Sequence, residues 1–425
     1  MNLDQPVSTR TIPVVGYAYP WDVIGDPTFV ERARELGVTK IALAAAYHTT
    51  RAATPLHPEH RTVTARSAAL YRPVRPEAWD GARLVPATAD WVTDRGTVAA
   101  DPFGQAAAVF AEAGIEVAAW IVLTHSTRLG EAHPDLAVRS CWDEPYPYAL
   151  CARHEDVRRY AETLAAVAVR ETPTTTVILE ACGQLGLAHG GHHEKTDGAY
   201  DAATQQLLSI CCCDACRADW TDRGLDAEAT VAALRSATGA GATVGGLPAD
   251  TLDTILASRH AAADELRGRV IAAVRTAAPE VSEIALHAQP DPWATGANPG
   301  LTRTAADDVD VVIAACWPTT EASVETGRQL AETVAGRAVA AAYVTVLPPT
   351  TDDAFRAHQS ALVDAGISEL HLYHLGLAGP DRQHLLAEAT RVPDPGTSAT
   401  DPGQRRPDDP TQTFQTTQTT QTTQS

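Results

Sequence analysis

The chain has 425 residues, of which 44 % are hydrophobic and 20 % are charged, so it has enough apolar material for a large core and is not disordered throughout. Its 53 acidic residues outnumber its 33 basic residues and give a net charge of −20. Because an acidic protein repels phosphate backbones, we expect no nucleic-acid partner. Eight cysteines are too few for a disulfide scaffold in a chain of this length.

The two ends of the chain predict no targeting signal and no membrane partner. Residues 1–10 lack a basic stretch followed by an apolar run, and no apolar stretch approaches the roughly 18 residues that span a bilayer. We therefore expect a cytoplasmic protein. Residues 1–391 are predicted to fold, whereas residues 392–425, rich in Pro, Thr and Gln, are predicted to be a disordered tail.

Eight short apolar runs without helical periodicity are predicted to be buried strands. They lie at 12–17, 40–46, 116–123, 175–179, 283–288, 310–316, 338–346 and 369–374. Amphipathic helices separate most of them; one begins at Asp101-Pro102, with Val109 and Phe110 predicted to face the core. His260, His358 and His384 are predicted to lie on helix surfaces.

This alternation favours an α/β fold, a closed (β/α)8 TIM barrel. An open doubly wound sheet is the alternative, but no Gly-x-Gly-x-x-Gly follows the first strand. The fourth and fifth strands are far apart in the sequence, so residues 183–250 are predicted to be an insertion that carries cysteines and histidines.

Aromatic and polar residues follow the predicted strands, and barrels keep their chemistry at the carboxyl ends of strands. Aromatic faces stack on sugar C–H surfaces and polar edges bind hydroxyls, so we expect a carbohydrate-binding cleft for a small-molecule substrate. The predicted substrate-binding residues are Trp21, Tyr47, His48, His125, Arg128, His192, His193, His287, Trp293, Trp317 and His374.

Glu180 ends an otherwise apolar strand, so its carboxyl group is predicted to face a cleft with little water. Partial desolvation raises a carboxyl pKa and suits a general acid near neutral pH. The alternative is a carboxylate that accepts hydrogen bonds from loop amides. Asp291, after the fifth strand, is the predicted second catalytic carboxylate, with Asp22 and Glu194 behind it.

Four cysteines lie between positions 211 and 216. Cys211, Cys213 and Cys216 form a Cys-x-Cys-x-x-Cys motif that can supply three thiolates to a tetrahedral structural zinc. The fourth ligand must come from elsewhere, and the candidates are Cys151, Cys141 and Cys182. A cluster of buried free thiols is the alternative.

A second histidine-rich segment allows another metal site. His189, His192, His193 and Glu194 are close in sequence, but Gly190 and Gly191 indicate a loop, which differs from the helical His-Glu-x-x-His arrangement. Binding of substrate by neutral histidines and a solvated loop are the other interpretations.

The order of Cys151, Glu180-x-x-Gly183 and Cys211-x-Cys213-x-x-Cys216 resembles the family-42 β-galactosidases. That resemblance implies that these four cysteines bind a structural zinc and that Glu180 is the acid/base. Two positions differ from the family's clan: Leu179 stands where the clan has Asn, and residues 338–347 contain no carboxylate where the clan has its nucleophile.

A broader resemblance extends over about residues 12–390. Segments 17–22, 44–48 and 187–194 resemble uncharacterised, glycoside-hydrolase-like TIM-barrel proteins of actinobacteria, a likeness that implies no established activity.

Three functional hypotheses follow. The first is a glycosidase-like hydrolase of carbohydrate metabolism that acts on a small glycoside, with Glu180 as the acid and Asp291 activating water or stabilising the oxocarbenium ion. The second is a metal-dependent lyase, isomerase or hydrolase that uses the segment from His189 to Glu194. The third is a non-catalytic carbohydrate-binding barrel.

Overall fold

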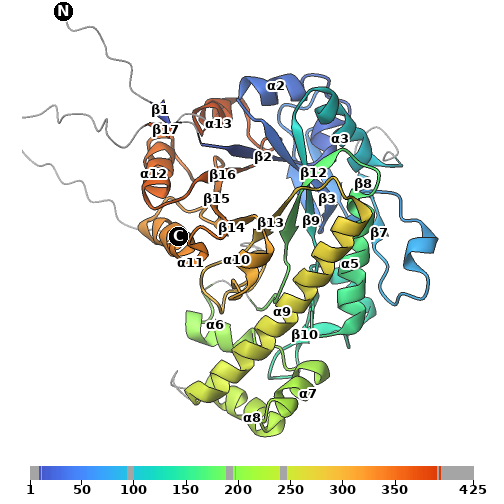
Figure 1. Cartoon of the computed structure of the whole chain (residues 1–425), viewed down its shortest axis with the longest axis vertical. Helices are drawn as coiled ribbons and strands as arrows, with labels where there is room; N and C mark the ends of the chain where they lie inside the picture. The colour runs from blue at the N-terminus through green and yellow to red at the C-terminus, as the bar shows by residue number, and fades with distance from the viewer. Residues whose placement is uncertain are drawn as a thin grey trace, which may run out of the picture.

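The computed structural model describes residues 9–10, 12–92, 100–187, 195–196, 198–239, 247–389 and 392–393 (Figure 1). Residues 392–393 form strand β17 (Val392–Pro393), which pairs with β1 (Thr9–Arg10). The rest of the predicted disordered tail lies outside the described residues.

Eight parallel strands close into a barrel, which confirms the predicted fold. They are β2 (Val14–Ala18), β3 (Lys40–Tyr47), β9 (Glu116–Val122), β12 (Thr174–Glu180), β13 (Glu283–His287), β14 (Val311–Ala315), β15 (Val339–Thr345) and β16 (Glu369–Tyr373). Leu370 of β16 pairs with Val14 of β2 and closes the ring. The predicted strand positions agree with these bounds because each strand is a buried, near-continuous apolar run.

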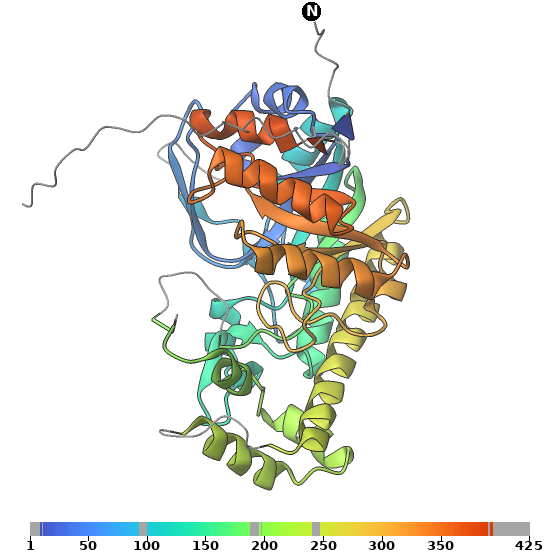
Figure 2. The same cartoon turned by 90° about the vertical axis from the view of Figure 1, so that its left-hand side faces the viewer.

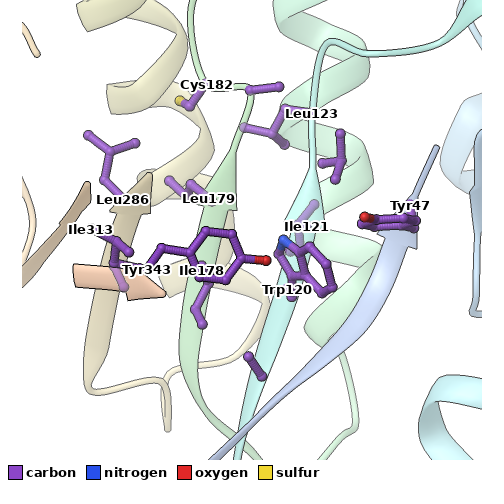
Figure 3. Close-up of a cluster of buried hydrophobic side chains, with 14 of the residues drawn as sticks. Tyr47, Trp120, Ile121, Leu123, Ile178, Leu179, Cys182, Leu286, Ile313 and Tyr343 are labelled. Atoms are coloured by element: carbon purple, nitrogen blue, oxygen red, sulfur yellow. The ribbon is translucent and has the colours of Figure 1, made fainter. Parts of the chain in front are cut away.

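Small and large side chains alternate around the barrel interior. Strand β3 is rich in buried alanines from Ala42 to Ala46, and β15 carries Ala340, Ala341 and Ala342. Large rings from other positions fill the space, and Figure 3 shows Tyr47, Trp120 and Tyr343 at one level of the barrel. The barrel is therefore packed below its mouth.

The outer helices cover the strands (Figures 1 and 2). They are α2 (Phe29–Glu35), α3 (Pro102–Glu112), α5 (Glu155–Val169), α10 (Ala305–Asp308), α11 (Glu321–Val334), α12 (Asp352–Asp364) and α13 (Gln383–Ala389). Asp101 caps α3 by accepting a hydrogen bond from the Gly104 amide at 2.9 Å, as its sequence predicts.

Two predicted side-chain positions are wrong. Val109 is 41 % exposed, because Phe103, Ala106, Ala107 and Phe110 form the inward stripe of α3 at helical spacing and Val109 lies beside it. His358 is buried, not on a helix surface, and its Nε2 lies 2.8 Å from the carbonyl oxygen of Cys316.

Short helices and strands lie in the loops between the barrel elements. They are α1 (Pro20–Val23), α4 (Thr127–Ala132), β4 (Thr50–Ala53), β5 (Thr62–Ala65), β6 (Ala69–Leu70), β7 (Ala87–Thr88), β8 (Trp91–Val92), β10 (Ala137–Arg139), β11 (Pro145–Leu150) and the 3-10 helices Pro76–Trp79 and Pro380–Arg382. No helix in the described part of the chain is long and apolar enough to cross a membrane.

The segment between β12 and β13 forms a helical lobe beside the barrel. It contains α6 (Ala202–Leu208), α7 (Asp214–Asp222), α8 (Ala227–Thr238) and the 29-residue α9 (Ala249–Ala277). Figure 2 shows α7, α8 and the first half of α9 projecting from the barrel, while the second half returns along it. There α9 packs on α5, with an ion pair between Arg269 and Glu162 at 2.8 Å.

Candidate functional site at the carboxyl end of the barrel

Glu180 is the last residue of β12, and only 6 % of its surface is exposed. Its Oε2 accepts a hydrogen bond of 2.6 Å from the indole nitrogen of Trp120 on β9. Burial raises the pKa of Glu180 to about 7, although the hydrogen bond from Trp120 works in the opposite direction. The carboxyl group is therefore divided between its protonated and ionised forms near neutral pH, as a general acid requires.

Several tyrosines lie close enough to this carboxyl group for its charge to affect them. The Tyr19 hydroxyl lies 3.2 Å from that of Tyr47 and 3.3 Å from that of Tyr373. Burial raises the pKa of Tyr47 and Tyr373, and the Glu180 carboxylate raises each of them further. These phenols remain neutral hydrogen-bond donors at neutral pH.

Tyr343 adds a further ring from β15. Burial raises its pKa well above the usual range, with Glu180 among the additional causes. Figure 3 shows the Tyr343 ring reaching across the barrel toward Trp120. Trp120 also packs edge-on against Tyr47 at a centroid distance of 4.6 Å, so the rings hold one another and the carboxyl group in place.

Two aromatic walls stand on either side of this centre. On one side Trp317, which is 38 % exposed, stacks on Tyr373 with ring centroids 4.7 Å apart. On the other side His48 stacks on Tyr47 at 4.2 Å and lies 4.6 Å from His125. Half-exposed ring faces beside a buried acid can bind the apolar faces of a sugar.

Asp22 is a second buried carboxyl group near these rings. Its Oδ2 accepts a hydrogen bond from the Tyr19 amide at 2.8 Å and lies 3.8 Å from His374 Nδ1. Its Oδ1 is buried without a hydrogen-bond partner, and burial raises the pKa of Asp22 to about 8. Asp22 is thus a mainly neutral acid at pH 7 and does not act there as a ready anionic nucleophile.

Three predicted substrate-binding residues lie in the interior. Trp21 is 1 % exposed and stacks on Tyr19 at 4.4 Å. His287 and His374 are fully buried, and burial lowers the pKa of each to about 3, so both rings are neutral. These three side chains are buried among other rings and present no exposed face to a substrate.

Three other predicted residues lie in more peripheral positions. Asp291 is exposed and accepts a hydrogen bond of 2.9 Å from the Trp293 amide, with no described contact to Glu180. The guanidinium of Arg259 covers the Trp293 ring at 5.8 Å. Arg128 is exposed and donates to the carbonyl oxygen of Val85, which braces a loop.

The four cysteines Cys151, Cys211, Cys213 and Cys216 come together, with their sulfur atoms all within 4.8 Å of one another. The Cys151–Cys216 and Cys213–Cys151 sulfur separations are 3.6 and 3.8 Å. Four tetrahedral bonds of about 2.3 Å to one metal ion would place the sulfurs about 3.8 Å apart. This cluster can therefore hold a metal ion.

The other two candidates for the fourth thiolate lie elsewhere. Cys141 contacts Thr238, and the thiol of Cys182 lies near Arg267. The predicted histidine-rich segment, with His189, His192, His193 and Glu194, lies outside the described residues.

The predicted substrate-binding residues omit several side chains of the centre, namely Trp120, Tyr19, Tyr343 and Tyr373. Part of the signal was present, because side chains two residues apart in a strand point to the same face. Tyr373 and His371 have this spacing in β16, and Tyr17 and Tyr19 have it in β2 and just after it. Nothing in the local sequence connects Trp120 with Glu180, which is 60 residues away.

No protein-family model matches the sequence, and no curated protein is similar to it in sequence. Solved structures share the fold. α-L-Fucosidase isoenzyme 2 from Paenibacillus thiaminolyticus has a TM-score of 0.53 at 13 % identity, covering 90 % of this chain and 49 % of its own. The β-galactosidase from Marinomonas ef1 has a TM-score of 0.52 at 11 % identity, covering 89 % and 58 %.

The catalytic domain of β-amylase from Paenibacillus polymyxa also has a TM-score of 0.52 at 11 % identity, and covers 89 % of this chain and 97 % of its own. The chain thus spans about half of the fucosidase and nearly the whole β-amylase domain. All three are glycoside hydrolases built on barrels, and at these identities the likeness establishes the fold alone.

Proposed function

We propose that this protein hydrolyses a small glycoside, with Glu180 as the general acid. The observation that carries the proposal is the buried Glu180 carboxyl group, whose pKa is raised to about 7, at the carboxyl end of a barrel strand between two aromatic walls. The glycoside hydrolases of similar fold support a carbohydrate substrate.

In the proposed reaction, protonated Glu180 donates its proton to the glycosidic oxygen as the bond to the sugar breaks. The Trp120 indole N–H, 2.6 Å from Oε2, stabilises the carboxylate that forms. The Tyr47 hydroxyl, which accepts from Tyr19, donates a hydrogen bond to a sugar hydroxyl, and Trp317 supplies a stacking face.

Asp291 takes the second carboxylate's role in this proposal, in the loop that follows β13. An inverting reaction needs carboxyl groups about 6.5–9.5 Å apart so that water fits between them, whereas a retaining reaction needs about 5 Å. Asp22 is buried and mainly protonated at pH 7, so it is less suited than an ionised carboxylate to act as a nucleophile on the sugar.

The Glu180→Gln variant tests the proposal. It removes the proton donor but keeps the shape of the side chain, so turnover of methyl glycosides, whose poor leaving group needs protonation, should fall by about a thousandfold or more while sugar binding is retained. Glu332→Gln, on the outer helix α11, is the control and should turn over normally. A Glu180→Gln enzyme of near-normal activity contradicts the assignment.

We further propose that Cys151, Cys211, Cys213 and Cys216 bind a structural zinc ion in a reducing, cytoplasmic environment. The sulfur separations of 3.6 and 3.8 Å and the eight free cysteines support this proposal. Four thiolates fill a tetrahedral zinc, so the ion supplies cross-linking and leaves no open position for substrate.

A carbohydrate-binding protein without turnover is the second candidate function. It is favoured by the composition of β15, Val-Ala-Ala-Ala-Tyr-Val-Thr, which has no carboxylate. Binding of sugars without hydrolysis of any glycoside in a broad panel would favour this function over the first.

A further inference from the structure

A chain of side-chain hydrogen bonds crosses the barrel interior and ends at Asn298, in a loop that is bonded to the residue after Glu180. Glu369 and His371 come from β16, Tyr17 from β2, His287 from β13, and Asn298 from the loop after β13. The successive distances are 2.7 Å from Glu369 Oε1 to His371 Nε2, 2.9 Å from His371 Nδ1 to the Tyr17 hydroxyl, 2.9 Å from that hydroxyl to His287 Nε2, and 2.9 Å from His287 Nδ1 to Asn298 Oδ1.

In the part of the chain from Asn298 through His287 to Tyr17, the donor of each hydrogen bond can be assigned. An amide oxygen only accepts hydrogen bonds, so His287 Nδ1 must carry the proton that it donates to Asn298 Oδ1. Burial lowers the pKa of His287 to about 3, which leaves the ring neutral. His287 Nε2 is therefore an acceptor, and the Tyr17 hydroxyl must donate to it.

In the part of the chain from Tyr17 through His371 to Glu369, the donors can be assigned in agreement with this. Because the Tyr17 hydroxyl spends its only proton on His287, its oxygen accepts from His371 Nδ1. Burial works to raise the pKa of Glu369, but its hydrogen bond with His371 holds the pKa below the usual value. The ionised Glu369 carboxylate then accepts from His371 Nε2. In this direction His371 donates from both ring nitrogens, so its ring must be an imidazolium that forms an ion pair of 2.7 Å with Glu369.

The loop that carries the last member of the chain is bonded to the residue after the proposed acid. Ala181, directly after Glu180, donates its amide hydrogen to the carbonyl oxygen of Ala297 at 2.9 Å. The loop is also held by the Gln289 amide, which donates to the Pro299 carbonyl oxygen at 3.0 Å. Asn298 is half-buried, and no described residue accepts a hydrogen bond from its Nδ2.

We propose that Asn298 is a substrate-binding residue, and that the chain through His287, Tyr17 and His371 orients its amide so that Nδ2 donates to a sugar hydroxyl beside Glu180. The inference rests on the proposed glycoside substrate. Asn298 would supply an amide donor near the acid. Leu179, the residue before Glu180 in β12, has no polar side-chain group and cannot do so.

Nuclear magnetic resonance of histidine ¹⁵N nuclei in the whole protein tests the orientation without any activity. His287, assigned by comparison with a His287→Gln variant, should be neutral with its proton on Nδ1. The Tyr17→Phe variant keeps the ring and removes the hydroxyl, and should change the Nε2 resonance. A proton on Nε2 would reverse the chain, place the amide oxygen toward the cleft, and overturn the inference.

Kinetics test the binding role, using the p-nitrophenyl glycoside that the wild-type protein hydrolyses fastest and its monodeoxy analogues. Asn298→Ala should lower kcat/KM about tenfold, as expected for loss of one neutral hydrogen bond. One monodeoxy substrate should show a similar loss with the wild type and little further loss with Asn298→Ala. Gln184→Ala, another amide in a neighbouring loop, is the control and should leave kcat/KM unchanged.

The failures of the two proposals are distinguishable. Normal kcat/KM of Asn298→Ala on all glycosides overturns the binding role of Asn298, while hydrolysis itself still supports Glu180. If the wild type hydrolyses no glycoside, the proposed function fails. In that case, a shift of the Asn298 side-chain amide resonance on addition of methyl glycosides supports sugar binding by Asn298, and an unchanged resonance overturns it.

Discussion

Glu180 is subject to two opposing influences that together place its pKa in a useful range. Removal from water favours the neutral acid, whereas the short hydrogen bond from Trp120 favours the carboxylate. If burial acted alone, the pKa of Glu180 would be higher and the carboxyl group would be a weaker acid. Trp120 thus assists proton release without touching the glycosidic oxygen.

The Trp120→Phe variant tests this balance. In an enzyme that uses protonated Glu180, activity should fall as pH rises through about 7, because the carboxyl group then loses its proton. Removing the indole N–H destabilises the carboxylate, raises the pKa, and should move this alkaline limb upward by about one pH unit. The measurement is the pH dependence of kcat.

Trp79→Phe is a matched control for this variant. Trp79 is also buried, but its indole nitrogen has no hydrogen-bond partner, and its ring packs on Tyr160. Its replacement should lower stability and leave the alkaline limb in place. An unchanged limb in Trp120→Phe would show that the hydrogen bond does not set the pKa of the catalytic acid.

At the residue scale, a functional residue could be predicted from the sequence when its own local pattern is unusual. It could not be predicted when its role depends on residues far away in the chain. Glu180 could be predicted because a carboxyl group at the end of an apolar strand is unusual by itself. Trp21 was misplaced because an aromatic ring after a strand can face either the mouth or the interior, and α1 turns this ring inward. The role of Asn298 depends on His287 and Ala181, which only the folded barrel brings near it.

Among the elements, the cysteine cluster joins parts that are separate in sequence. Cys151 lies between β11 and α5 on the barrel, whereas the other three cysteines precede and begin α7 in the helical lobe. A metal ion on these four sulfurs would fasten the lobe to the barrel. The three cysteines of the Cys-x-Cys-x-x-Cys motif were predictable from their spacing, whereas Cys151 was predicted as the fourth only through the resemblance to the family-42 β-galactosidases. The fold brings Cys151 to the other three and leaves Cys141 and Cys182 elsewhere.

Removal of one sulfur should release the proposed metal. In Cys213→Ser we expect about one equivalent of zinc to be lost from the purified protein, together with faster proteolysis within the lobe. Cys316→Ser, which alters a buried thiol bonded to none of the four, is the control and should retain zinc. Metal analysis that finds no zinc in the wild type contradicts the proposal.

The long helix α9 is attached to the barrel by a buried arginine. Arg267 is 1 % exposed and donates to Asp308 and Asp264, and also to Thr302 and Thr304. Thr302, Thr304 and Asp308 follow the loop that carries Asn298, whereas Asp264 lies on α9 itself. The attachment therefore supports both the lobe and the proposed substrate-binding loop.

Arg267→Met should lower the free energy of unfolding by about 3 kcal/mol, because it leaves partly buried carboxylates and hydroxyls without their donor. The measurement is urea unfolding of the whole chain. Arg328→Met, on the exposed face of α11, should change it by less than about 0.5 kcal/mol. Equal effects of the two variants would show that burial of Arg267 is unimportant for stability.

On the scale of the whole molecule, the closed barrel could be predicted because the same strand and helix pattern repeats along the sequence. Each strand is a short buried run and most connections contain an amphipathic helix, so local patterns added up to the correct architecture. The lobe was less predictable, because its helices are defined by contacts with α9 and the hairpin of β10 and β11. The structures of similar fold are glycoside hydrolases, and the chemistry of the mouth must decide whether this barrel shares their activity.

The most direct measurement compares the wild type and Glu180→Ala on two glycosides of the same sugar, one with a 2,4-dinitrophenyl leaving group and one with a methyl leaving group. A good leaving group departs without protonation, whereas a poor one needs the acid. If Glu180 is the general acid, the variant should lose hydrolysis of the methyl glycoside and retain much of its bond-breaking rate on the dinitrophenyl glycoside. Equal losses on both substrates, or no loss on either, would contradict the assignment of Glu180.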